Sequence, residues 1–98
     1  MFRHVVVFVW TPEATDGQKG AVAEALRALP GVIDTIRDYR IGADAGLAEG
    51  NSDFAVVADF DDVDGYLTYR DHPEHQRVIA ELIRPILASR AAVQHTMG

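Results

Sequence analysis

One apolar segment near the N-terminus constrains the fold of this chain more than any other feature. Successive side chains of a β-strand point to opposite faces of the sheet. A strand from about Arg3 to Trp10, which Pro12 ends, therefore presents apolar side chains on both faces. The residues of one face are Val5, Val7 and Val9, and those of the other are Val6, Phe8 and Trp10.

A helix is expected directly after this strand. Thr15 and Gln18 have the spacing of a capping box, in which each side chain bonds the backbone of the other residue. Apolar residues then recur at helical spacing from Val22 onward. This pattern predicts a helix from about Asp16 to Leu29, which Pro30 ends.

Two further strands follow. The segment from Val32 to Ile41 combines β-branched residues with several charged ones, which is typical of a half-solvated edge strand. The apolar segment from Phe54 to Phe60 predicts the third strand, and the Gly-containing stretch from Gly42 to Ser52 is short enough to be a loop.

The C-terminal part of the sequence predicts two helices and a last strand. Asp61 and Asp62 can cap a short helix, and Asp71 with Pro73 restarts a second one. Arg90 to Met97 is the expected fourth strand. The resulting β-α-β-β-α-β order predicts an α+β fold of the ferredoxin-like type, with a four-stranded antiparallel sheet and both helices on one face. The second helix is expected to bury Val78, Ile79, Leu82, Ile83 and Ile86.

The two-faced first strand also predicts a partner. Two helices cover only one face of a four-stranded sheet, so a second subunit is the expected cover for the other face. We therefore expect a homodimer with two-fold symmetry. The alternative is a monomer whose loop from Gly42 to Ser52 covers part of that face.

Length, charge and composition narrow the remaining possibilities. The 98 residues predict one domain over residues 1–98. A net charge of −6 without a basic cluster argues against nucleic acid and anionic membranes as partners. The apolar segment is too short for a signal peptide or a membrane span. The absence of cysteine excludes disulfides and fits a cytoplasmic location.

His75 and Tyr69 are the strongest candidates for chemistry. His75 precedes Val78 and Ile79 by three and four residues, so it lies on the apolar face of its helix and points into the protein. A neutral imidazole beside a phenol can remove a proton next to a ketone, with the phenol donating a hydrogen bond to the enolate. The alternative is that both residues are structural and bond to the backbone.

A metal site at this helix start is the weaker interpretation. His72 and His75 are flanked by Asp71 and Glu74, which are residue types that bind divalent metals. Acidic residues are also what capping of a helix start requires. We therefore expect neither a metal nor another cofactor.

Several segments together resemble the stress-responsive A/B barrel (Dabb) domain family. They are Phe2-Arg3-His4 before the apolar strand, Leu29-Pro30-Gly31-Val32, the strand from Asp53 to Phe60 and, most specifically, the Tyr-x-x-His-Pro-x-His segment from Tyr69 to His75. The resemblance spans the whole chain. It implies homodimers in which two ferredoxin-like sheets form a dimeric α/β barrel.

The resemblance also implies a site. A plant polyketide cyclase of this family closes a linear poly-β-ketone by aldol chemistry without a cofactor. Its acid/base pair corresponds to Tyr69 and His75, and its first-strand histidine corresponds to His4. Phe54 stands where that enzyme has a second histidine, and Gln94 stands where many relatives have an aspartate.

These observations predict a cavity between sheet and helices that holds a small apolar or aromatic-like molecule. His4, Phe54, Val78 and Ile79 are the expected substrate-binding residues, and His75 and Tyr69 the expected catalytic ones. Three functions stay open: a cofactor-free cyclase or isomerase, a non-catalytic ligand-binding or stress-protective dimer, and a cofactor-free monooxygenase. The last would require Trp10 and His4 in one pocket.

Overall fold

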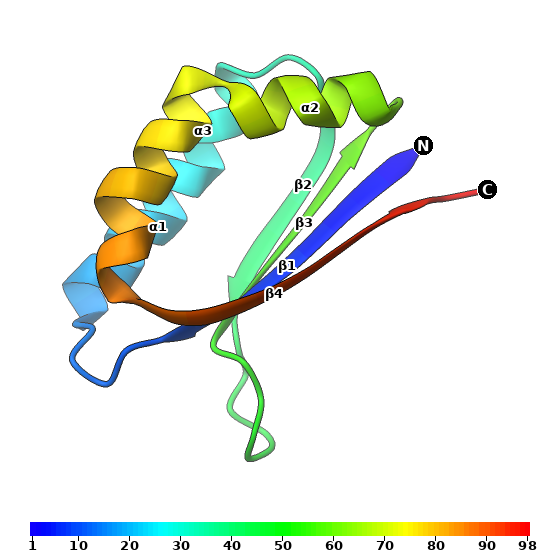
Figure 1. The fold of residues 1–98 in the computed structure, drawn as a ribbon. Coiled ribbons are helices and arrows are strands. Elements are labelled where there is room, and N and C mark those ends of the chain that lie inside the picture. Colours follow the sequence, from blue (N-terminus) through cyan, green and yellow to red (C-terminus); the bar gives the residue numbers. More distant parts are fainter.

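Helices cover one face of a four-stranded antiparallel sheet and leave the other face open (Figure 1). The computed structural model describes all residues from 1 to 98. The strands lie in the order β2-β3-β1-β4, so β1 and β3 are central and β4 is an edge. This arrangement confirms the α+β, ferredoxin-like fold. The strands are β1 (Phe2–Trp10), β2 (Ile36–Ala43), β3 (Phe54–Phe60) and β4 (Leu87–Thr96).

Three α-helices lie on the covered face (Figure 1). They are α1 (Asp16–Ala28), α2 (Val63–Asp71) and α3 (Pro73–Val78). A 3-10 turn at Leu29–Gly31 follows α1. After α3 the chain continues through a π-helical turn at Ile79–Ile83 and a 3-10 turn at Arg84–Ile86, and then enters β4.

The helix starts agree with the sequence patterns, with one correction. Thr15 and Gln18 form the expected capping box of α1, and Asp62 accepts a hydrogen bond from the backbone N–H of Gly65 in α2. The cap of α3 is His72, whose Nδ1 accepts from the N–H of Glu74, and not Asp71. Asp71 is the last residue of α2 and pairs with Arg70, so its carboxylate is already engaged.

Alternating burial along β1 sets the inner and outer faces of the sheet. His4, Val6, Phe8 and Trp10 are buried beneath the helices, whereas the valines between them are only partly buried. We call the helix-covered side the inner face and the opposite side the outer face. The core is built from inner-face side chains and from Val22, Leu26, Leu29, Tyr69, Val78 and Ile83.

Two strand boundaries differ from the sequence prediction. The second strand begins at Ile36 and not at Val32, because the N–H groups of Val32 and Ile33 both bond the carbonyl of Leu29 and continue the turn after α1. The fourth strand begins at Leu87 and not at Arg90, because extended backbone resumes directly after the 3-10 turn.

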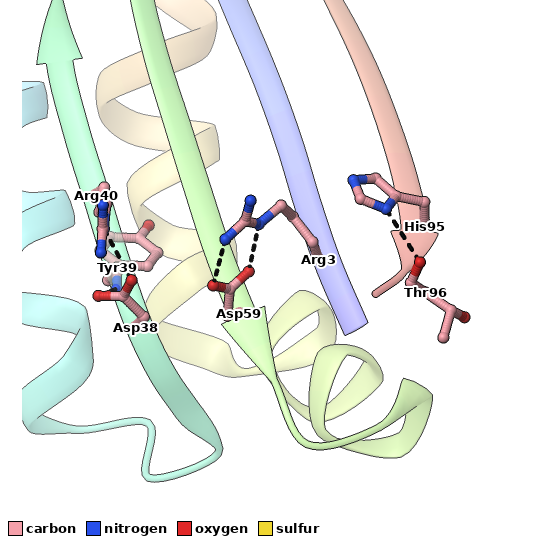
Figure 2. A network of polar contacts seen from close by, with 7 residues as sticks. All are labelled: Arg3, Asp38, Tyr39, Arg40, Asp59, His95 and Thr96. Atoms are coloured by element: carbon pink, nitrogen blue, oxygen red, sulfur yellow. Dashed lines mark hydrogen bonds and ion pairs between the residues drawn. The ribbon is translucent and has the colours of Figure 1, made fainter. Parts of the chain in front are cut away.

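The outer face carries a polar network at one end, shown in Figure 2. Arg3 donates two hydrogen bonds to the carboxylate of Asp59, at 2.7 and 2.8 Å. On the neighbouring strand β2, Arg40 pairs with Asp38, two residues away, at 2.8 Å. His95 lies on the same face because it is the β4 residue opposite Arg3. His4 is opposite Gln94 and points to the inner face, so His4 and His95 lie on opposite faces of the sheet.

Candidate functional site

A cavity of about 330 Å³ lies between the inner face of the sheet and the helices. Nine of its 14 lining residues are hydrophobic, so it suits a small and largely apolar molecule. The residues with ionisable side chains that line it are His4, Tyr66, Tyr69, His75 and three arginines, Arg70, Arg84 and Arg90.

The end of α2 fixes the orientation of His75. The last carbonyls of a helix have no intrahelical partner, and the carbonyl of Arg70 is one of them. His75 Nδ1 lies 3.0 Å from this oxygen, and the side-chain amide of Gln76 donates to it as well. A carbonyl oxygen only accepts, so Nδ1 carries the proton and Nε2 carries the free lone pair.

His75 is therefore a neutral base. Burial lowers the pKa of His75 below its usual value, although the bond to the Arg70 carbonyl raises it. No protein group hydrogen-bonds Nε2, and His75 lines the cavity. The lone pair of Nε2 is thus free to accept a proton from a bound molecule.

Tyr69 contacts His75 through its ring and not through its hydroxyl. The two ring centroids are 4.1 Å apart, with an angle of 32° between the planes. The Tyr69 hydroxyl instead lies 3.0 Å from the hydroxyl of Tyr39 on β2, and either oxygen can donate. Burial raises the pKa of Tyr39 to about 12 and that of Tyr69 even further. Both phenols are protonated donors at neutral pH.

Tyr39 was not predicted from the sequence as a site residue. It belongs to the charged edge strand and is separated from Tyr69 by 30 residues. The alternation of β2, which turns Tyr39 and Ile41 toward the core, was the only available signal.

His4 lies across the cavity and is held by Gln94. The amide nitrogen of Gln94 is 2.8 Å from His4 Nδ1. An amide nitrogen only donates, so Nδ1 accepts and the ring proton is on Nε2. Burial, together with the charge of Arg90, lowers the pKa of His4 to about 4. Gln94 therefore orients His4, and it does so without a charge.

The cavity brings together four of the six predicted site residues. His4, Tyr69, His75 and Ile79 line it. Val78 does not, because its side chain is fully buried in the core. Phe54 does not either, because it packs against Phe8 and Trp10 at the other end of the sheet. Trp10 is also absent from the lining, so the arrangement that a monooxygenase would require is not present.

The acidic residues around His72 already have partners. Asp71 pairs with Arg70, and Glu74 pairs with Arg77. No three His, Asp or Glu side chains of the chain are grouped so that they could share a metal ion. None of the helices has the length and apolar character needed to cross a membrane.

Two known proteins are similar to this chain over most of its length. An uncharacterized protein of Streptomyces coelicolor is 32% identical over 82 residues, which cover 82% of this chain and 84% of that protein. The crystal structure of a dimeric ferredoxin-like protein from Thermobifida fusca is 47% identical, with a TM-score of 0.90. The match covers 98% of this chain and 90% of that one.

A more distant structure has the same fold. The hydroxynitrile lyase of Passiflora edulis superimposes with a TM-score of 0.86 at 15% identity, covering 99% of this chain and 93% of the lyase. The sequence pattern of the stress-responsive A/B barrel domain matches residues 2–96, almost the entire chain. The chain therefore belongs to the stress-responsive A/B barrel domain (Dabb) family.

Proposed function

We propose that this protein binds a small, largely apolar carbonyl compound in the cavity and removes a proton from the carbon next to the carbonyl. His75 is the general base. The observation that carries the proposal is the bond from Nδ1 to the Arg70 carbonyl, which fixes the ring and leaves Nε2 unpartnered in an apolar cavity. A base held in this way needs no metal or organic cofactor for proton abstraction.

Two donors are available for the enolate oxygen that forms. His4 presents an Nε2–H group, because Gln94 occupies its Nδ1. The Tyr69 hydroxyl can donate to the enolate oxygen when the Tyr39 hydroxyl donates its own proton to Tyr69. Donors that are already in place stabilise developing negative charge without reorganisation during the reaction. The ring of Tyr69 also supports His75 by direct contact.

The same first step begins an aldol cyclisation of the polyketide cyclase type. Once Nε2 of His75 has taken the proton, the enolate carbon attacks a second carbonyl of the same molecule and forms the new C–C bond. His75 then returns the proton to the resulting alkoxide. The hydroxynitrile lyase with the same fold supports the view that this architecture can hold a catalytic site.

We also propose that the protein is a homodimer joined through the outer face. Val5, Val7 and Val9 lie there beside Val57 and Val93, and Val93 is 55% exposed. A stripe of this size and character is expected to be covered by a partner. The similar Thermobifida fusca protein is described as dimeric, which supports the proposal.

Deuterium exchange tests the chemistry. A panel of aryl ketones and β-diketones is incubated in D₂O with the protein, and loss of the α-proton signal is followed by NMR. His75→Asn should reduce the acceleration by roughly a hundredfold to ten-thousandfold, the usual contribution of a positioned general base.

His72→Asn is the matched control for this experiment. His72 caps α3 and does not line the cavity. Asparagine keeps the capping acceptor, so exchange should remain at the wild-type rate. If the wild type binds ketones without accelerating exchange, the protein is a ligand-binding dimer and the catalytic proposal is wrong.

A further inference from the structure

Arginines are distributed unevenly in this molecule. Five of the eight are held in ion pairs with Asp or Glu. Of the three that are not, Arg84 and Arg90 line the cavity and only Arg27 lies elsewhere. Two of the three unpaired arginines therefore line this one cavity.

The cavity has no negative charge to balance these arginines. None of its 14 lining residues is an aspartate or glutamate, although the chain as a whole has a net charge of −6. Arg70 also lines the cavity, but Asp71 neutralises it. A concave site with one sign of charge attracts ligands of the opposite sign.

Separate elements bring these two side chains to the cavity. Arg84 begins the 3-10 turn that follows the π-helical turn. Arg90 is the β4 residue opposite Phe8, so it lies on the inner face. Both are exposed, whereas His75 is buried. Both arginines thus lie on the solvent side of the cavity, and the base is deeper inside.

We infer that the ligand of this cavity is a carboxylate: a small apolar or aromatic keto acid whose carboxylate binds Arg84 and Arg90 while its ketone end reaches His75. The inference rests on the proposed function, because it names the ligand class of the same site. Guanidinium groups match the planar, two-oxygen geometry of a carboxylate. The apolar lining suits the remainder of the molecule.

A matched pair of probes tests the inference. 3-Benzoylpropionate has an aromatic ring, a ketone and a carboxylate, and its methyl ester keeps the ring and the ketone but replaces the carboxylate with an uncharged ester group. Isothermal titration of the wild-type protein at low salt should show that the acid binds at least about tenfold more tightly than the ester, the usual range for hydrogen bonds to charged groups. The preference should decrease as salt is added.

Four variants test whether Arg84 and Arg90 cause this preference. Arg84→Gln and Arg90→Gln should each lower the preference for the acid, and the double variant should remove it while binding of the ester is retained. Arg27→Gln removes an unpaired arginine outside the cavity and should change nothing. Both cavity arginines are exposed, so folding is expected to be preserved, which circular dichroism checks.

The outcomes separate this inference from the proposed chemistry. If the acid and the ester bind equally well, or if the double variant keeps the preference, the inference is overturned even where His75-dependent proton exchange is observed. If the acid binds through Arg84 and Arg90 but no exchange occurs at its methylene next to the ketone, the inference stands and the catalytic proposal falls.

Discussion

The two faces of the sheet differ in whether their arginines are paired with acidic side chains. On the outer face, Arg3 is neutralised by Asp59 and Arg40 by Asp38, and an apolar stripe continues beyond them. In the inner cavity, the histidines are neutral, and Arg84 and Arg90 have no acidic partner. Self-neutralised charge beside apolar area suits a contact with another protein surface. Unbalanced charge beside an apolar cavity suits a small charged ligand.

A single strand serves both faces. In β1 the alternation places Arg3, Val5 and Val7 outside and His4 and Val6 inside. A shift of register by one residue would exchange these two sets. The pairing of β1 with β3 and β4 therefore determines both which residues form the outer apolar stripe and which residues line the inner cavity.

The largest expected effect comes from charging the outer face. Val7→Glu places a carboxylate between Ala55 and Ala91 on the outer face, where a partner subunit would leave it without a counter-charge. An uncompensated buried charge costs about 3–5 kcal/mol, so the dimer should dissociate at least about a hundredfold more readily. Light scattering at micromolar concentration should then show the 10.7 kDa monomer.

Val32→Glu is the control for that prediction. Val32 is 57% exposed and lies in the turn after α1, away from the outer face. This variant should keep the mass of the wild type. If the wild type itself has the mass of a monomer, the proposed interface is wrong.

The sequence was informative wherever local patterns decide structure. The period of two in β1, the capping box at Thr15 and the break at Pro73 predicted the elements and their order. The start of β2 was misplaced because Val32 and Ile33 have strand-forming side chains, yet their N–H groups bond back to Leu29. Side-chain preference does not reveal such a backbone bond.

The site was predictable only in part, for a related reason. The spacing of His75 from Val78 and Ile79 correctly placed it on the buried face. Contacts between distant residues leave no local pattern, and the bond between Tyr39 and Tyr69 is of this kind. Phe54 was assigned to the cavity because it stands where the resembling cyclase has a second histidine, but its position along β3 puts it beside Trp10.

Lowering the pH should decrease the folding stability, because the histidines of the inner face are neutral in the folded protein. The pKa of His4 is about 4 in the folded protein, against 6.5 as the usual value. The unfolded chain therefore binds more protons between these two pH values, and folding stability is full above about pH 6.5 and decreases toward pH 4. We expect a loss on the order of 2 kcal/mol, measured by urea denaturation across this range.

Two variants test whether His4 causes this pH dependence. His4→Gln should make the decrease smaller, because this side chain can no longer be protonated, and the part that comes from His75 should remain. His72→Asn should retain it, because His72 lies at a helix start outside the cavity. A slope that is equal in His4→Gln and wild type would show that other groups account for the acid sensitivity.

The smallest expected effect concerns the bond between the two phenols. Tyr39→Phe keeps the aromatic contact with Tyr69 and removes only the hydroxyl 3.0 Å from the Tyr69 hydroxyl. A net hydrogen bond contributes about 1 kcal/mol, so urea denaturation should show a loss of roughly that size. Proton exchange on a ketone should slow only a few-fold, because His75 is held by the Arg70 carbonyl and not by either phenol. Tyr66→Phe is the matched control, since it likewise removes one phenol hydroxyl near Tyr69, and the Tyr66 hydroxyl has no partner within the chain. If Tyr39→Phe abolished exchange while folding was preserved, the phenol pair would be part of the proton path. The proposed roles of His75 as the base and Tyr69 as a hydrogen-bond donor would then be wrong.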